Sequence, residues 1–596
     1  MAGQPKTAFY VAVFLVVAAL VGFAIWRADI FAPEGEQPQG ANVNPDEFGK
    51  LAGGAQPDGA SGQPGAEAPD QARPTTFEKY SFVGRETISE ITEASAYVPL
   101  DQTNNTVKFS LNVWAGWAPI ILANEGFQPG KVWKTADGQE FKVELVLIDD
   151  PSQMRALYAQ GQVHIGWATV DMLPLVLQAL VDRSGQPRDP RTMPRVFQQI
   201  DWSSGGDGIV VREAIRTMGD LKGQKVSLAQ NSPSHYFLLY MMSAARLQPS
   251  DIEMVFTPTA FDAAAAFNGD RSIAAAVSWA PDIYNLSEVQ GNRLLVSTAT
   301  ANKLIADVWF ARADFARDHK DKLEALVRGI FDAMEQLKTD EAKQRCATLM
   351  AAGYDIPVEE IQGMFADAHS TNWAENRQFF LNKNNPTNFE TVYNNAYRAY
   401  RLIGTVNHEP VPFEQIVDPS ILEKLGQEDK YATQRDESRV VLQPRPLSEI
   451  RGAEADPGIV VSTFTVHFFP NSSDLYKKII REKDGQQVEE LYDPNVDEVL
   501  DEIARLAASF GVAYVNISGH TDASMKGKVP DTLVQDLSRG RAEAVRDALL
   551  NRYRDLGPER FTVEGAGWNR PADPDEPNNH AQNRRVEVQV YPAEVE

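Results

Sequence analysis

The chain has 596 residues, enough for more than one domain, and 43% of them are hydrophobic, so sizeable cores can form. Its formal net charge is −25, from 82 acidic against 57 basic residues. Nonspecific binding to nucleic acid needs a positive field, so this charge argues against a nucleic-acid partner. The single cysteine, Cys346, rules out an intramolecular disulfide and a cysteine-based metal site.

Residues 8–26, AFYVAVFLVVAALVGFAIW, contain no charged side chain. A helix of this length rises about 28 Å, close to the thickness of the hydrocarbon layer of a bilayer. Lys6 precedes the run, so residues 1–7 are expected to stay in the cytoplasm while the rest crosses the membrane. The alternative is a cleaved signal peptide, whose apolar region is usually about 7–15 residues long. The run is longer, and Trp26 and Arg27 interrupt the expected cleavage zone, so we predict an uncleaved transmembrane anchor.

Two stretches, residues 27–75 and 428–458, are predicted to be linkers. The first is dense in Gly, Pro, Gln, Ala and Asp and has almost no aromatic or β-branched residues, so it cannot bury enough surface to fold. The second is charged and contains prolines. These linkers separate two candidate domains, residues 76–427 and 459–596.

Helices and strands alternate in the second of these domains, which predicts an α/β sandwich with helices on one face. Asp493 and Pro494 offer a cap and a first-turn proline for one helix, and Asp536 or Ser538 offers a cap for the next. That second helix is expected over residues 534–550. Alternating and apolar runs predict strands at residues 463–469, 512–517, 561–564 and 586–590.

Four short motifs follow one another in the same domain: ISGHTD after a strand, LSRGRAEAV opening a helix, VEGAGW, and NRRVEV. Together they resemble the OmpA-like C-terminal domain family, over about residues 460–591. The resemblance implies noncovalent binding to the peptide stem of peptidoglycan. A domain that keeps this fold but has lost the ligand is the alternative.

By motif position, the resemblance assigns peptidoglycan binding to Asp522 and Arg541, with Arg584 as a second contact. Diaminopimelate carries an ammonium and a carboxylate on one centre, so a carboxylate facing a guanidinium can hold both. Arg541 is expected near a helix N-terminus, where an anion is also favoured. His520 is expected to pack within its turn rather than to catalyse. Val534 stands where the family often has Asn, which puts the strength of binding in doubt.

Strands and helices also alternate through the first domain, which indicates parallel sheets with ligand-binding turns at the carboxyl ends of the strands. The chain shows, in order, a W-x-x-W-x-P turn, the unit ALYAQGQVHIGWAT, and the segments SSGGDGIVV, DLKGQKV and AAAVSWAPD. This series resembles the type 2 periplasmic substrate-binding proteins of the nitrate, sulfonate, taurine and thiamine-precursor transport families, over about residues 107–380. The resemblance implies two lobes that close on a ligand. Two crossing strands, expected near residues 196–200 and 307–310, should join them.

Turns at strand ends should converge on the cleft between these lobes. Ser232 and Ser234 open a helix whose free N–H groups favour an anion, which predicts a small anionic solute. Asp207 is interpreted as a turn cap, and for each tryptophan an ordinary place in the core is the alternative. The candidate solute contacts are Trp114, Trp117, Thr169, Ser203, Ser204, Ser234, Trp279 and Asp282.

The sequence thus predicts a membrane-tethered periplasmic solute-binding protein, anchored to peptidoglycan, that serves uptake or sensing. Expected partners are peptidoglycan, a small solute, the inner membrane and a transporter permease; neither a cofactor nor a metal is expected. The alternative is a structural or stator-like envelope subunit, but stators carry a membrane-embedded acid and residues 8–26 have none. An enzyme is not expected: a related thiamine-pyrimidine synthase uses a cysteine cluster and metal-binding histidines, whereas this chain has one Cys and eight scattered His.

Overall fold

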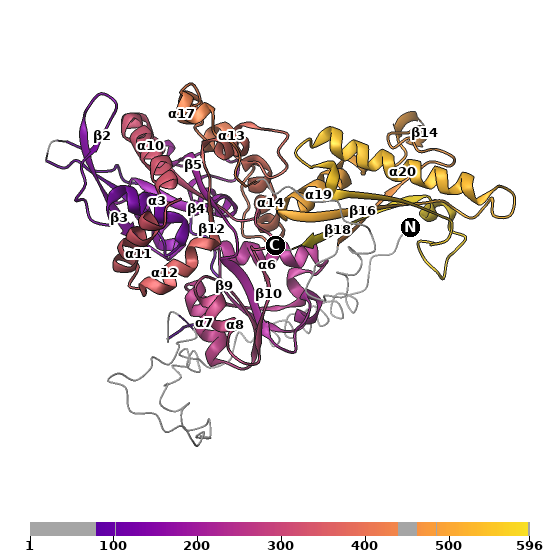
Figure 1. Ribbon diagram of the computed structural model, residues 1–596, viewed down its shortest axis with the longest axis horizontal. Helices are drawn as coiled ribbons and strands as arrows, with labels where there is room; N and C mark the ends of the chain where they lie inside the picture. Colours follow the sequence, from indigo (N-terminus) through magenta and orange to yellow (C-terminus); the bar gives the residue numbers. More distant parts are fainter. Residues whose placement is uncertain (1–74, 76–78, 102, 439–461, 484–485, 594–596) are drawn as a thin grey trace, which may run out of the picture. The chain divides into compact units, whose positions relative to one another are not determined.

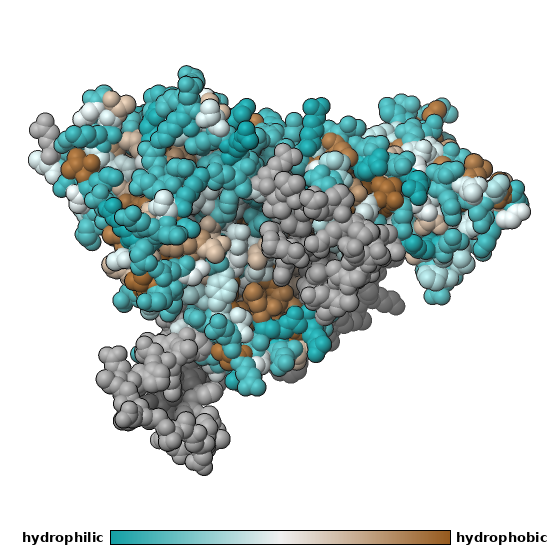
Figure 2. All heavy atoms as spheres, viewed as in Figure 1, coloured by the Kyte–Doolittle hydropathy of each residue, from teal (hydrophilic) through white to brown (hydrophobic). Residues whose placement is uncertain are grey.

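The computed structural model describes residues 75, 79–101, 103–438, 462–483 and 486–593 (Figure 1). The predicted cytoplasmic segment 1–7, the anchor 8–26 and nearly all of the linker 27–75 lie outside these residues. Among the residues that are described, no helix is both long enough and apolar enough to cross a membrane. On the face shown in Figure 2, hydrophilic residues predominate and hydrophobic residues occur in separate groups.

The first lobe of the substrate-binding-like domain is built on a seven-stranded sheet of order β12-β5-β11-β4-β1-β3-β2. β1 pairs in parallel with β3 and β4, whereas β11 runs antiparallel to its neighbours β4 and β5. The strands are β1 (Thr106–Leu111), β2 (Trp133–Lys134), β3 (Glu140–Leu147), β4 (Ile165–Thr169), β5 (Pro194–Ser203), β11 (Ala306–Arg312) and β12 (Ala368–Ser370).

Helices between these strands follow local sequence signals. Asp150 caps α4 by accepting the N–H groups of Ser152 and Gln153, and Pro151 stands at the first helical position. Every residue of α5 is buried, as expected for a helix that is apolar on all sides. The helices of this part are α3 (Ala118–Asn124), α4 (Pro151–Ala159) and α5 (Leu173–Leu180).

The second lobe is built on a five-stranded sheet of order β10-β6-β9-β7-β8. All seven residues of β9 are buried, which matches a central strand covered on both faces. The strands are β6 (Asp207–Arg212), β7 (Lys225–Ala229), β8 (Glu253–Thr257), β9 (Ile273–Trp279) and β10 (Asn292–Ser297). The helices are α6 (Pro233–Ala244), α7 (Ala260–Gly269) and α8 (Asp282–Ser287).

Two crossings join the lobes. The chain leaves the first sheet at the end of β5 and enters the second at β6, and it returns from β10 to β11. β5 and β11 pair with each other. The crossings expected near residues 196–200 and 307–310 are therefore confirmed, and with them the two-lobed α/β fold.

After β11 the chain is mainly helical and stays part of this domain. The linker was expected to begin at residue 428, which is wrong, because residues 429–432 form α17. Tyr431 of α17 is buried beside Phe331, and Glu428 accepts a hydrogen bond of 2.8 Å from Arg328. The helices are α9 (Ala313–Asp318), α10 (Lys320–Gln336), α11 (Asp340–Tyr354), α12 (Val358–Met364), α13 (Trp373–Leu381), α14 (Phe389–Leu402), α15 (Phe413–Ile416), α16 (Ser420–Leu425) and α17 (Asp429–Ala432).

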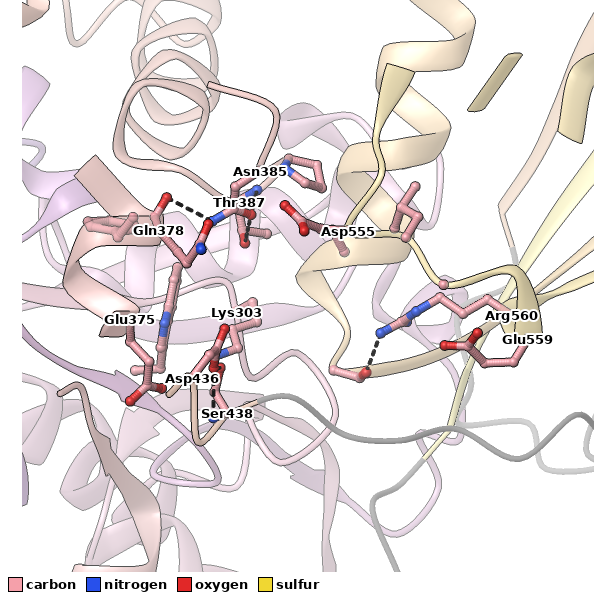
Figure 3. A pocket seen from close by; sticks show the side chains of 17 residues that line it. Lys303, Glu375, Gln378, Asn385, Thr387, Asp436, Ser438, Asp555, Glu559 and Arg560 are labelled. Carbon is pink, nitrogen blue, oxygen red and sulfur yellow. Dashed lines mark hydrogen bonds between the residues drawn. The ribbon is translucent and has the colours of Figure 1, made fainter. Parts of the chain in front are cut away.

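The OmpA-like domain has a four-stranded sheet of order β13-β18-β16-β17, and α19 and α20 pack against it. Arg560 donates to the carbonyl of Gly511 at 2.8 Å, which ties the start of β17 to the start of β16 (Figure 3). The sequence did not predict the hairpin formed by β14 and β15. The elements are β13 (Ser462–His467), β14 (Lys478–Lys483), β15 (Gln486–Leu491), α19 (Val496–Ser509), β16 (Val512–His520), α20 (Asp531–Arg552), β17 (Phe561–Gly567), α21 (His580–Asn583) and β18 (Arg585–Ala593).

The expected order of strands and helices in this domain is confirmed, but the caps are wrong. α20 begins three residues earlier than expected, after Pro530, so Asp536 and Ser538 lie inside the helix. α19 follows Asn495. Asp493 instead accepts the backbone N–H groups of His467 and Asn495, at 2.9 and 3.0 Å.

Candidate functional site

The carboxyl ends of the strands bring predicted solute residues into rows. In the first lobe, Thr169 at the end of β4 is aligned with Asp307 of β11, and Asp307 is aligned with Asp201 of β5. In the second lobe, Asp207 at the start of β6 is aligned with Trp279 at the end of β9. These rows place polar side chains where the crossing strands join the lobes.

The turn between β5 and β6, residues 203–207, is held from both lobes. Ser203 Oγ lies 2.8 Å from Thr298 Oγ1, and Thr298 also accepts the N–H of Gly205 at 3.0 Å. Tyr284 donates to the carbonyl of Gly205 and to the carboxylate of Asp367. Gly205 has a φ of 135°, which residues with a side chain rarely adopt, so the turn requires glycine. A hydrogen-bonded hinge region results.

The tryptophans of the W-x-x-W-x-P turn have different surroundings. Trp114 donates its indole N–H to Asp201 at 2.9 Å, next to the hinge. Trp117 is fully buried, donates to Asn112 at 2.8 Å and lies edge-on to Phe109. The alternative of an ordinary core residue therefore describes Trp117, whereas Trp114 lies beside the hinge.

Several of the remaining candidates are buried without a hydrogen-bond partner for their polar atoms. Among the described residues, this holds for the hydroxyl of Ser234 and for the indole N–H of Trp279, whereas the Thr169 hydroxyl acts on the carboxyl of Asp171 as a hydrogen-bond donor. Asn231, which the sequence analysis missed, has neither side-chain polar atom paired. Such groups are costly to bury, so their presence beside strand ends of the second lobe calls for an explanation.

The other three residues near these strand ends have different surroundings. Ser204 donates its backbone N–H to the carbonyl of Asp367 at 2.6 Å. Ser232 is the N-cap residue of α6, and its hydroxyl donates to Ala229. Asp282 is the first residue of α8 and is buried.

Five buried aspartates near the hinge were not predicted as site residues. Burial raises the pKa of the carboxyl groups of Asp171 and Asp207 to about 7, and that of Asp367 to about 6. Burial also raises the pKa of Asp201 and Asp307, which face each other in paired strands. Asp207 begins β6 and is buried, and a hydrogen bond from Ser203 in the same turn acts on its carboxyl, as the interpretation of a turn cap expects. The sequence signal that could have identified these aspartates is an Asp that stands at or near the end of one strand or the start of the next.

In the OmpA-like domain, Asp522 forms an ion pair with Arg584, with 2.9 Å between carboxylate oxygen and Nη1. The expected partner Arg541 is 1% exposed and uses its donors on backbone carbonyls. It lies in the third turn of α20, so the expectation of a helix N-terminus beside it is wrong. The carbonyls are those of Ser472 at 2.8 Å, His520 at 2.9 Å and Phe469 at 3.1 Å.

Asp522 stays charged although its surroundings are partly buried. Burial acts to raise the pKa of its carboxyl, but hydrogen bonds from Ser524 and Arg584 outweigh burial and lower it. His580 Nδ1 lies 3.9 Å from the same carboxylate. The Arg584 Nε and the Thr521 hydroxyl are buried and have no hydrogen-bond partner among the described residues. A zwitterionic group would find both a charged acceptor and free donors here.

His520 packs inside the domain, as expected. Its ring is fully buried, and Nε2 lies 3.6 Å from the carboxylate of Glu587. Its backbone carbonyl accepts from Arg541.

Comparison with known proteins identifies both domains. Residues 486–585 match the OmpA family, and residues 204–342 match a family described as NMT1/THI5 like. The taurine-binding periplasmic protein of Escherichia coli (strain K12) is 28% identical over 186 residues, 31% of this chain and 53% of that protein. A putative aliphatic sulfonates-binding protein of the same organism is 26% identical over 240 residues, 37% of this chain and 72% of that protein. The chain thus spans about half the length of the first relative, and the resemblance to both families is confirmed.

Solved structures similar to this chain include the periplasmic aliphatic sulphonate binding protein of Escherichia coli (19% identity, TM-score 0.36, covering 45% of this chain and 85% of that chain). The periplasmic nitrate-binding protein of Synechocystis PCC 6803 has 13% identity and a TM-score of 0.41, covering 54% and 88%. A desulfurization enzyme has 17% identity and a TM-score of 0.37, covering 54% and 98%. At these TM-scores the likeness adds nothing to the topology described above. The two relatives matched by sequence are both named as binding proteins.

Proposed function

We propose that the protein is a periplasmic solute-binding protein whose two-lobed domain closes on a small molecule while its OmpA-like domain binds peptidoglycan. The observation that carries the first half is the set of buried polar atoms without partners beside strand ends of the second lobe, at Asn231, Ser234 and Trp279. A ligand enclosed by the lobes would pair with these atoms. The names of the two relatives, a taurine-binding protein and a sulfonates-binding protein, support the same function.

An anionic group of the solute is proposed to bind at the start of α6. This helix has 12 residues, and the unpartnered hydroxyl of Ser234 lies in its first turn. Backbone N–H groups at a helix start and a hydroxyl donor both favour an oxyanion. The sulfonate named in the second relative is such a group.

Native mass spectrometry of the detergent-purified full chain tests solute binding, because it reports a co-purified small molecule directly. A thermal shift panel of oxyanions and small metabolites extends the test, since a ligand that binds only the folded state stabilises it by RT ln(1 + [L]/Kd). Ser234→Trp should fill the start of α6 and abolish any shift. If no molecule is retained, and no compound of the panel raises the melting temperature of the wild type or of Ser234→Trp, the proposal of solute binding is wrong.

For the second half, we propose that Asp522 and Arg584 contact the diaminopimelate of the peptidoglycan stem. Asp522 would accept the ammonium and Arg584 would hold the carboxylate. Arg541 would act by positioning, because it holds the carbonyl of His520, which lies two residues before Asp522 in the same motif. Co-sedimentation of the full chain with purified sacculi tests this half, and a chain that stays in solution at low salt would contradict it.

The proposal includes an uncleaved anchor at residues 8–26 in the inner membrane and delivery of the solute to a transporter permease or a sensing role. The anchor is supported by the uncharged run of residues 8–26, and the delivery of a solute is supported by the match to the NMT1/THI5-like family. N-terminal sequencing of the mature protein tests the anchor. A first residue beyond Ala28 would show that the segment is cleaved.

A further inference from the structure

Five buried carboxyl groups gather where the two crossing strands join the lobes. Asp201 and Asp307 are direct neighbours in paired strands, and Asp307 is also in register with Thr169, two residues before Asp171. The acidic hinge, as we name this group, consists of Asp171, Asp201, Asp207, Asp307 and Asp367, each at most 5% exposed.

None of these five carboxyls forms an ion pair with a Lys or Arg side chain within the described part of the chain. Elsewhere in the same domain a buried carboxylate does have such a partner: Asp314 lies 2.9 Å from Arg312. Burying a carboxylate without a cation is costly, so the group either takes up a proton or waits for a positive partner. Within the described residues, no Lys or Arg side chain therefore balances the negative charge of the acidic hinge.

The carboxyl groups of the acidic hinge differ in the hydrogen bonds that they accept. Asp201 accepts from Trp114, and Asp367 accepts from Tyr284. Asp171 is fully buried, a hydrogen bond from the Thr169 hydroxyl acts on its carboxyl, and no basic side chain pairs with it among the described residues. Asp207 lies close enough for its charge to act on Asp171, although one belongs to the first lobe and the other begins the second.

A second observation points to a ligand at the same place. Trp279, Asn231 and Ser234 carry unpartnered polar atoms and are each at most 4% exposed. Thr169 lies in the row of Asp307, and Trp279 lies in the row of Asp207. An unpartnered group of the second lobe, the indole N–H of Trp279, thus lies in the row of one of these carboxyls.

We infer that the solute enclosed by the two lobes carries a positively charged organic group, an ammonium or amidinium, which binds to Asp171 and Asp207. The inference rests on the proposed solute-binding function and specifies the chemistry of its ligand. A molecule that also bears an oxyanion would satisfy the start of α6 at its other end. No set of three or more His, Cys, Asp or Glu residues in the described ranges is arranged to hold a metal ion, so an organic cation is the class we assign.

Binding of such a group should become tighter as the pH rises. Burial raises the pKa of Asp171 and Asp207 to about 7, so a cation binds best once these groups have lost their protons. Between pH 6 and pH 8 the charged fraction of one such group rises about tenfold. Other groups face them: Asp201, Asp307 and Asp367 of the hinge, His369 near Asp201, and Tyr236 and Tyr400 near Asp171.

The test uses the full chain in detergent and small probes that carry a cationic group, a sulfonate, or both. Taurine carries an ammonium and a sulfonate, ethanesulfonate lacks the ammonium, and ethylamine and agmatine lack the anion. Thermal shift and calorimetry at pH 8 should show binding of ammonium- or amidinium-bearing probes in the wild type. Asp171→Asn should weaken that binding at least tenfold and leave ethanesulfonate unaffected, and Asp207→Asn should act in the same direction.

Asp318→Asn is the matched control, because it removes the same charge from α9, after the far end of β11. It should bind all probes like the wild type. Stabilisation by ethanesulfonate alone, or equal binding of amines by Asp171→Asn and wild type, overturns the inference while solute binding stands. Binding of no amine also overturns it, and native mass spectrometry then decides separately whether the lobes hold any molecule.

Discussion

The two ends of strand β11 differ in whether a buried carboxylate has a cationic partner. At the carboxyl end of β11, the guanidinium of Arg312 contacts the carboxylate of Asp314 at 2.9 Å and three backbone carbonyls. At its other end, Asp307 faces Asp201 and no basic side chain pairs with either among the described residues. Both ends are buried, so the difference lies in the partner. An internal cation completes the fold at one end, and its absence at the other leaves a place for a cation from outside.

The largest expected effect comes from breaking the paired end. Arg312→Ala would leave Asp314 buried without its cation and would leave the carbonyls of Tyr158 and Ala159 without a donor. Removing one partner of a buried ion pair costs about 3–5 kcal/mol. Chemical denaturation followed by tryptophan fluorescence should show this loss, and a loss below about 1 kcal/mol would mean that the pair does not hold the fold.

The Asp522–Arg584 pair extends the comparison, because it is internal but partly accessible. Asp522→Ala or Arg584→Ala should weaken co-sedimentation with sacculi by tens of fold, since a half-buried charge without its partner costs about 2–5 kcal/mol at a desolvated contact. Binding by the wild type should also weaken as salt rises.

Arg552→Ala is the control for this experiment. Arg552 lies on the same helix α20 and pairs with Asp497 and Asp501 on the surface. Its loss should leave co-sedimentation unchanged. Arg541→Lys should reduce stability more than it reduces sacculus binding, because its donors hold carbonyls. Equal loss of binding in the Arg541 and Asp522 variants at full stability would instead make Arg541 a direct contact.

We expect the unpaired carboxyl groups of the acidic hinge to make the stability of the ligand-free protein depend on pH. The pKa of Asp171 and Asp207 is raised to about 7 in the folded state, above the ordinary value of 3.8. The folded state therefore binds more protons than the unfolded state between about pH 4 and pH 7, and the free energy of unfolding falls as the pH rises through this window. Asp171→Asn should make this fall shallower and should raise stability at pH 8 by about 1 kcal/mol or more. A fall as steep as in the wild type would show that Asp171 is already paired.

Periodicity and motif order predicted the elements that depend on local signals. β5, β11, β16 and the helices around them lie where the sequence placed them, because apolar spacing determines which face is buried. The cap of α20 was missed because Pro530 begins the helix before any of the usual capping side chains.

The acidic hinge was missed for a different reason. Asp201 and Asp307 are more than a hundred positions apart in the chain, and only strand pairing makes them neighbours. Arg541 was predicted as the partner of Asp522 because a motif gives the position of a residue in the chain but not the direction of its side chain. In the fold, Arg541 points to backbone carbonyls, and Arg584 reaches the carboxylate.

The smallest effect separates Trp114 from Trp117. Both indoles donate a buried hydrogen bond, to Asp201 at 2.9 Å and to Asn112 at 2.8 Å respectively. Replacing either by Phe should cost about 1 kcal/mol of stability for the lost bond, with some added packing loss. Only Trp114→Phe removes a donor from a carboxyl of the acidic hinge, so only this variant should change the pH at which amine probes begin to bind. It should move that pH downward, because Asp201 without its donor stays protonated to a higher pH and then raises the pKa of Asp207 less. Calorimetry with taurine between pH 6 and pH 8 measures the shift for both variants. An equal shift in Trp117→Phe would place both tryptophans at the cleft and remove the distinction between core and site.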